Sequence, residues 1–289
     1  MGASRPTRRA AYDARMPRTI RVLTLNCWNV SEPYATRMAV ARAAIAALDP
    51  DIVGLQEIIV RRDGFDQAAD VLGGLGYHIA YAPAFRWTED GHVPCDTDGD
   101  GFGNAIASRW PIVASERRAL PGEEIGERRC ALAAHLAAPF ARIPVVCAHL
   151  AWRFEHGPLR ERQVRALDEL ARAWARDADF PPIVVGDLNA DPDANEIRYL
   201  CGLAALEGRS TYYQDAWRVR GVGAGFTWDN RNPYAGMMFE PDRRLDYVLV
   251  GLADLNGRGW IERVALACDE PVDGVWASDH LGVVADVRI

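Results

Sequence analysis

Six short apolar runs in this chain of 289 residues each meet a side chain that can bind a metal ion or transfer a proton. The runs are VLTLN ending at Asn26, IVGLQE ending at Glu57, PVVCAHL with His149, PIVVGDLN with Asp187 and Asn189, RLDYVLV with Asp246, and SDHLGVV with Asp279 and His280. An oxygen-rich cluster combined with histidine is what displacement at an anionic phosphate requires. The ordered set therefore predicts a divalent-metal site that handles phosphate esters.

The spacing of these runs also predicts the domain organisation. They extend from residue 26 to residue 280, so one site would draw on nearly the whole chain, and we expect a single domain over residues 19–289. Residues 1–18 carry five Arg and one Asp without an apolar segment, which predicts a disordered basic tail and not a secretory signal. No later stretch approaches the roughly 20 apolar residues of a transmembrane helix.

Short apolar runs alternate with helical patterns along the chain. Strands are expected at residues 20–26, 52–56, 77–82, 182–186, 245–250 and 283–289, with several more between 104 and 146. Helices are expected at residues 36–48, 67–75 and 158–175, where apolar residues recur at helical spacing. Residues 83–102 are predicted to form a long polar loop over the site.

Composition limits the partners and the compartment. The net charge is −7, and all 33 basic residues are Arg, so the chain lacks the positive field of a sequence-indifferent duplex binder. Nucleic acid is thereby disfavoured as a substrate but not excluded, and Arg153, Arg160 and Arg162 are the one local basic cluster nominated for it. The six cysteines form no CxxC pair, which favours free thiols and a cytoplasmic protein.

Two carboxylates follow strongly apolar runs. Asp187 ends a buried strand, where ligands of α/β sheets collect, and Asn189 lies two residues further on the same side. The alternative is an Asx-turn at a strand end. Glu57 in its apolar setting is costly unless it is paired or binds a metal, and the alternative is a salt bridge to Arg61 or Arg62.

The remaining candidates are less specific by themselves. Asn26 can be an ordinary turn residue, and His149 can be a core histidine. Asp279 and His280 offer a carboxylate and an imidazole as sequence neighbours, and Asp246 is the expected partner that holds His280 in one tautomer. Without a common site, these are unrelated polar groups at strand ends.

Two further segments bear on ligands. Asp96, Asp98 and Asp100 match the first half of a Ca²⁺ loop, but position twelve is Ala107 instead of Glu, which leaves a partial Ca²⁺ site or a plain acidic turn. This segment directly precedes a strand with Asn104, which is a further candidate for substrate contact. Residues 226–234 form an aromatic and amide-rich loop in which Trp228 and Asn230 are candidates for substrate contact, or only cap the core.

Together these residues resemble the endonuclease/exonuclease/phosphatase superfamily. The resemblance covers residues 20–289 and rests on the ordered motifs LN, QE, GNAIxSR, AHL, GDLN, RLDY and SDH. It implies a four-layer α/β/β/α sandwich with two central, mostly antiparallel sheets, which is an α/β (α+β) fold. It also implies a Mg²⁺ or Mn²⁺ ion held mainly by Glu57, with Asn26 and Asp279.

The same resemblance implies roles for the other residues. Asp187 and Asn189 position the attacking water and the phosphate, His149 contacts a phosphoryl oxygen, and His280 binds the phosphate with support from Asp246. Whether Asp187 or the His280–Asp246 pair is the general base stays open.

Three functions are compatible with this sequence. The first is a metal-dependent phosphodiesterase or phosphatase, expected to be a monomer and to act on a small or lipid-derived phosphate ester. The second is a nuclease or DNA-repair enzyme with the same core. The third is a non-catalytic protein that binds phosphate esters, which is disfavoured because no member of the motif set is substituted.

Overall fold

The computed structural model describes residues 19–88, 91–94 and 101–289. The predicted basic tail of residues 1–18 lies outside the described residues, as does the candidate Ca²⁺ segment with Asp96, Asp98 and Asp100.

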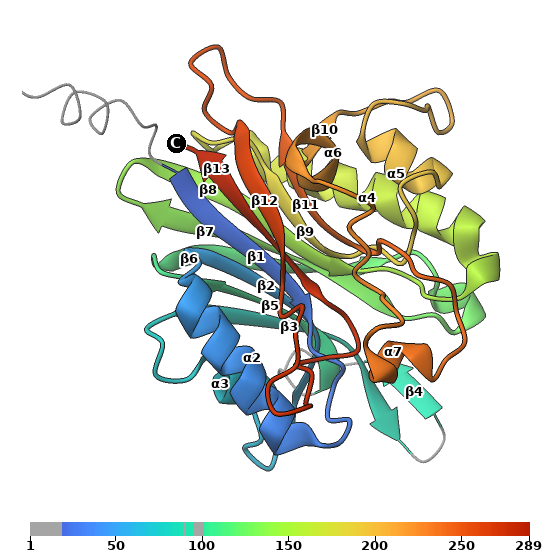
Figure 1. Cartoon of the computed structure of the whole chain (residues 1–289). Coiled ribbons are helices and arrows are strands. Elements are labelled where there is room, and N and C mark those ends of the chain that lie inside the picture. Colours follow the sequence, from blue (N-terminus) through green and yellow to red (C-terminus); the bar gives the residue numbers. More distant parts are fainter. Residues whose placement is uncertain (1–18, 89–90, 95–100) are drawn as a thin grey trace, which may run out of the picture.

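Two mixed sheets stack face to face in the centre of the molecule (Figure 1). The first sheet contains β1 (Thr19–Asn26), β2 (Ile52–Val60), β3 (His78–Thr88), β4 (Gly91–Pro94), β5 (Gly101–Ser108), β12 (Ile261–Ala267) and β13 (Gly282–Arg288), in the order β12-β13-β1-β2-β5-β3-β4. The second contains β6 (Ile112–Leu120), β7 (Arg129–Ala138), β8 (Ala141–His149), β9 (Ile183–Asp187), β10 (Tyr213–Asp215) and β11 (Asp246–Gly251), in the order β10-β11-β9-β8-β7-β6.

Helices cover the outer faces of both sheets. On the first sheet lie α2 (Tyr34–Leu48) and α3 (Gln67–Leu72), and on the second lie α4 (Gly157–Ala175) and α5 (Asn195–Leu200). The shorter helices are α6 (Ala216–Arg220), α7 (Pro233–Gly236), η1 (Glu123–Ile125) and η2 (Phe154–His156). Among the described strands, only the pairs β1/β2 and β8/β9 are parallel. The predicted four-layer, mostly antiparallel α/β/β/α sandwich is confirmed.

The main core lies between the two sheets, because alternate residues of each strand point to this layer. Gly54 on β2 marks a very close approach of the sheets: a Cβ atom there would lie 2.3 Å from Cγ2 of Val185 on β9. No larger residue fits at this position unless the sheets move apart.

The prediction of a long polar loop over residues 83–102 was wrong in its described part. Strand β3 continues to Thr88 and pairs with β4, and β5 begins at Gly101. Pro83 suggested a break, but the strand accommodates it at a register shift between Pro83 and Phe85. Phe85 then packs into the core, with its ring 4.8 Å from that of Phe102.

Several elements have too little sequence pattern to be expected: β10, β12, α5, α6 and α7 are short or lie at a sheet edge. Within the described ranges, no helix is both long and apolar enough to cross a bilayer. The five described cysteines are buried free thiols, and burial raises the pKa of four of them, Cys27, Cys147, Cys201 and Cys268.

Candidate active site

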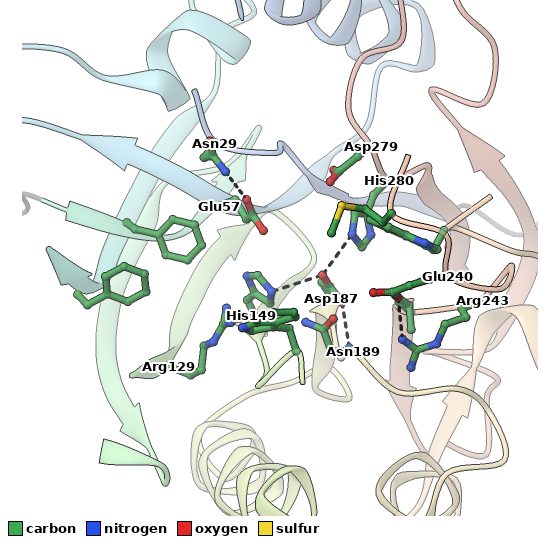
Figure 2. Close-up of a pocket in the computed structure, with 16 residues that line it drawn as sticks. Asn29, Glu57, Arg129, His149, Asp187, Asn189, Glu240, Arg243, Asp279 and His280 are labelled. Carbon is green, nitrogen blue, oxygen red and sulfur yellow. Dashed lines mark hydrogen bonds and ion pairs between the residues drawn. The ribbon is translucent and has the colours of Figure 1, made fainter. Parts of the chain in front are cut away.

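A cavity of about 290 Å³ opens where strands from both sheets end, and it collects most of the predicted residues (Figure 2). Its charged and amide-bearing lining residues are Asn29, Glu57, Arg129, His149, Asp187, Asn189, Glu240, Arg243, Asp279 and His280. We call His149, Asp187, Asp246 and His280 the imidazole side, and Glu57, Asp279 and Asn29 the carboxylate side.

Strand register builds the imidazole side. His149 on β8 pairs with Asp187 on β9, and Asp187 pairs with Asp246 on β11, so three neighbouring strands present their side chains on one face. His149 Nε2 lies 3.4 Å and His280 Nε2 3.7 Å from Asp187 Oδ2. His280 Nδ1 lies 2.8 Å from Asp246 Oδ2, which is the contact expected from the sequence.

The two histidines differ in charge. Burial lowers the pKa of His149 well below its usual value, and the charges of Arg129 and His280 lower it further, so His149 is neutral. Burial also acts to lower the pKa of His280, but the carboxylates of Asp246 and Asp187 outweigh it and raise that pKa well above the usual value. One neutral imidazole and one imidazolium therefore flank Asp187.

Hydrogen bonds fix the Asp187 carboxylate. The backbone N–H of Asn189 donates to Oδ1 (2.9 Å), and the Asn26 amide donates to Oδ2 (3.0 Å). Asn189 adopts a left-handed backbone with φ of 50°, a strained conformation for a residue other than glycine, and its side-chain amide donates to Leu150 O (3.1 Å). Burial raises the pKa of Asp187.

On the carboxylate side, Glu57 lies at an irregularity of β2, where the pairing register shifts between Leu55 and Ile58. It has a φ of 57°, which aims its side chain into the cavity. The Asn26 amide donates to Oε1 (3.3 Å) and the Asn29 amide to Oε2 (2.9 Å). The same Asn26 amide contacts both Glu57 and Asp187, so the two sides meet directly.

The carboxylate side fits a divalent cation. Burial raises the pKa of Asp279, and the nearby charge of Glu57 raises it further. Within the described part of the chain, neither carboxylate lies within ion-pair distance of an arginine or histidine. Each Glu57 oxygen accepts one of these amide hydrogen bonds and keeps a lone pair for a ligand.

A second group of potential ligand atoms lies on the imidazole side, where atoms of Asp187, Asp246 and His280 all fall within 4.8 Å of one another. In this group the carboxylates of Asp246 and Asp187 raise the pKa of His280, so both of its ring nitrogens carry protons and neither offers a lone pair to a metal. This charge state favours proton handling over metal binding.

Seven of the predicted residues line the cavity: Glu57, His149, Asp187, Asn189, Trp228, Asp279 and His280. Asn26 and Asp246 lie directly behind them, and the Asn26 amide oxygen accepts from Trp28 N–H instead of facing the cavity. Asn104 is buried between the sheets and donates to Cys130 O (2.9 Å). Asn230 is exposed and donates to Asp242. The structure does not bring Asn104 and Asn230 to the cavity.

Sequence reasoning missed several lining residues. Arg129 is buried near His149 and pairs through Nε with Glu127 (2.6 Å), but its Nη1 has no hydrogen-bond partner among the described residues, so that nitrogen can donate to a bound anion. Arg129 begins the apolar run RCALAAHL, whereas most of the predicted site residues stand at the end of such a run. Asn29 follows the LNC motif without a run of its own, and Arg243 directly precedes RLDY.

The comparison with known families agrees with this geometry. The model of the Endonuclease/Exonuclease/phosphatase family matches residues 23–280. The chain belongs to this family. Members of the endonuclease/exonuclease/phosphatase family include metal-dependent phosphoesterases and nucleases that act on phosphodiester bonds. Among curated proteins, none matches the chain.

Solved structures share the fold of this family member. An endonuclease/exonuclease/phosphatase from Beutenbergia cavernae DSM 12333 is 26% identical with a TM-score of 0.73, over 94% of this chain and 72% of that one. The human Nocturnin catalytic domain with bound sulfate is 21% identical (TM-score 0.69; 94% and 93% covered). D. rerio TDP2 complexed with a single-strand DNA product is 20% identical (TM-score 0.68; 94% and 99% covered).

Proposed function

We propose that this protein is a divalent-metal-dependent hydrolase of phosphate esters, either a phosphodiesterase or a phosphatase. The observation that carries the proposal is the arrangement of the cavity. Two carboxylates that form no ion pair with a described residue, Glu57 and Asp279, lie beside an aspartate that is flanked by two imidazoles. This combination serves an anionic ester and an attacking water at the same time.

Glu57 and Asp279 would hold a Mg²⁺ or Mn²⁺ ion, because both metals prefer oxygen ligands. Asn29 would orient Glu57, and Asn26 would contribute by holding Glu57 beside Asp187. When bound, the ion supplies positive charge that stabilises the developing negative charge on a phosphoryl oxygen.

The remaining residues account for proton transfer. Asp187 accepts a proton from the attacking water, because His280 is already cationic and Asp187 is a carboxylate held in place by two hydrogen bonds. The water oxygen bonds to phosphorus while the bond between phosphorus and the leaving oxygen breaks. The His280 imidazolium can donate a proton to that leaving oxygen. Neutral His149 and the Arg129 guanidinium bind phosphoryl oxygens.

Exposed apolar side chains at the mouth of the cavity support a small or lipid-derived substrate. Trp152 and Met238 line the cavity and are both more than half exposed, and the adjacent Phe239 is 94% exposed. Phe154 lies under the guanidinium of Arg243, another lining residue. Such a rim suits an ester with an apolar group.

A nuclease is the second candidate, because Trp152 and Trp228 offer aromatic surfaces on which bases stack. The similar fold of D. rerio TDP2, described with a single-strand DNA product, points the same way. The nominated basic cluster is weaker than expected. Arg160 is buried in an ion pair with Glu196 (2.7 Å), and Arg162 pairs with Glu124 (2.5 Å). Arg153 and Arg162 are both exposed, but Arg153 also lies near a glutamate, at 3.8 Å from Glu155.

For the setting of this reaction, we propose a monomer in the cytoplasm. The buried free thiols of the described cysteines support a reducing compartment. Size-exclusion chromatography with light scattering and fractionation of cells test the two parts of this proposal.

Hydrolysis of bis-nitrophenyl phosphate and nitrophenyl phosphate with Mg²⁺, Mn²⁺ or EDTA tests the proposed function. We expect metal-dependent turnover that Glu57→Gln abolishes, while the control Glu116→Gln on β6 keeps it. Activity that survives EDTA or Glu57→Gln would refute the metal assignment. Nicking of plasmid at low salt distinguishes the nuclease, and tight ester binding without turnover distinguishes a binding protein.

A further inference from the structure

Arg37 on α2 is a fully buried cation that has no carboxylate within ion-pair distance among the described residues, although the charge of Asp279 acts on it from farther away. Other buried arginines of the chain are paired, such as Arg160 with Glu196 and Arg244 with Asp215. A buried charge is costly, so its hydrogen bonds have to compensate for the lost water. Every hydrogen-bond acceptor of Arg37 among the described residues is a backbone carbonyl oxygen.

The guanidinium of Arg37 joins two segments that are far apart in sequence. Its nitrogens donate to the carbonyl oxygens of Cys27 (3.0 Å), Trp28 (3.2 Å), Asn29 (3.2 Å) and Ser31 (2.7 and 3.0 Å) in the loop after β1. Nη1 also donates to Ala277 O (3.0 Å), immediately before the SDH motif. The guanidinium carbon lies 4.8 Å from the Trp28 ring centroid.

The loop after β1 has an unfavourable local conformation. Trp28 and Asn29 are consecutive non-glycine residues with φ of 51° and 41°. Non-glycine residues keep this left-handed backbone conformation only where surrounding contacts impose it. Arg37 donates to the carbonyl oxygens of both residues. It shares this role with Ser31 N–H, which donates to Trp28 O (3.3 Å), and with the Gln67 amide, which donates to Asn29 O (2.7 Å), but Arg37 alone among the three also bonds to the segment before the SDH motif.

Both segments lead to the carboxylate side of the cavity. Asn29 donates to Glu57 Oε2 (2.9 Å), and Ala277 lies two residues before Asp279. We propose that Arg37 is the positioning residue of the metal site, and that its planar, five-donor fork sets the separation between Glu57 and Asp279. This inference rests on the proposed metal-dependent function.

The test is Mn²⁺ affinity, measured by calorimetry on Arg37→Met and Arg37→Lys. We expect Arg37→Met to weaken Mn²⁺ binding at least about tenfold, as loss of a supporting contact behind a metal ligand does. Arg37→Lys should recover only part of this loss, because one ammonium group cannot bond to both segments. Added ethylguanidinium should restore affinity to Arg37→Ala, which a general loss of stability would not allow.

Asp168→Ala is the matched control, because this buried carboxylate on α4 also gathers three hydrogen bonds, from Tyr199, Thr211 and Tyr213, but does not line the cavity. It should lower the melting temperature and leave Mn²⁺ affinity unchanged. If the Arg37 variants do not fold, Asn29→Ala tests the next link: it keeps the backbone carbonyl that Arg37 binds, removes the hydrogen bond from this turn to Glu57, and should weaken Mn²⁺ binding.

Soluble Arg37→Met or Asn29→Ala with wild-type Mn²⁺ affinity would overturn the inference. The proposed function is judged separately, on ester turnover by the wild-type protein. A failure of turnover is therefore distinguishable from a failure of the positioning role.

Discussion

The imidazole side and the carboxylate side of the cavity hold their acids in opposite ways. Asp187 and Asp246 each lie within ion-pair distance of the cationic His280 imidazole, at 3.7 and 2.8 Å. Glu57 and Asp279, in the described part of the chain, accept hydrogen bonds only from neutral donors, and the charges of His280 and Arg37 act on Asp279 without an ion-pair contact. An acid that already has an internal cation partner is held ready for proton transfer, whereas one without a partner is ready for an external cation.

This difference decides between the two possible metal positions. Proximity of ligand atoms alone selects Asp187, Asp246 and His280. Charge balance selects Glu57 and Asp279 instead, because the imidazolium of His280 would repel a divalent ion placed beside it. Four experiments test this comparison.

The largest effect is expected for Asp187→Asn. Loss of the proton acceptor should lower kcat by about 10³- to 10⁴-fold. Mn²⁺ affinity should change by less than about threefold, because the carboxylate side is untouched. Steady-state kinetics and calorimetry on one preparation check both. A large loss of Mn²⁺ affinity would place the ion on the imidazole side.

Asp246→Asn should lower kcat by about 10²- to 10³-fold, because His280 loses the carboxylate that orients it and keeps it charged. The NMR titration of His280 should shift to lower pH, since Asp246 raises its pKa. Unchanged kcat with weakened Mn²⁺ binding would contradict the assignment of Asp246 to the imidazole side.

Asp279→Asn should weaken Mn²⁺ binding by about tenfold to a hundredfold, with a smaller loss of kcat at saturating metal. Calorimetry and the Mn²⁺ dependence of the rate measure the two quantities. Ser278→Ala, which removes only a hydroxyl next to Asp279, is the matched control. Equal Mn²⁺ affinity in wild type and Asp279→Asn would remove this residue from the ligand set.

The smallest effect is a pH dependence of the metal-free protein. The folded-state pKa of Asp279 is raised from 3.8 to about 7, so the folded state holds this proton more tightly than the unfolded state. This tighter proton binding contributes to the free energy of unfolding at low pH, and the contribution is lost as pH rises toward 7. We expect Mn²⁺ to raise the melting temperature about 2–4 °C more at pH 8 than at pH 5. Asp279→Asn should remove that difference in scanning calorimetry.

Much of this site was predictable because strand ends carry it. Buried strands produce continuous apolar runs, so the polar residue that ends a run, such as His149 or Asp187, stands out in sequence. Strand pairing then brings these ends together. The partnership of His280 with Asp246 followed from the known need of a catalytic imidazole for a carboxylate, and the structure has this contact.

Residues that act through turns had no such signal. A left-handed turn brings the Asn29 side chain to Glu57 and directs backbone carbonyls toward Arg37. No periodic sequence pattern predicts such a turn, so neither residue stands out in the sequence. Asn104 is a candidate for substrate contact because it belongs to the GNAIxSR motif beside the acidic segment, yet its strand points it between the sheets. The β3–β4 hairpin was missed because its aromatic and charged residues follow Pro83.

The close contact at Gly54 links the interior of the molecule to its chemistry. Glu57 belongs to one sheet and Asp187 to the other, so the gap between the sheets is also the gap between the two halves of the catalytic apparatus. Gly54 and Val185 limit that gap from within the core, three residues before Glu57 and two before Asp187. A mutation at this buried contact can therefore alter turnover while every reactive group stays in place, so natural variants that differ in rate deserve inspection here as well as at the cavity surface.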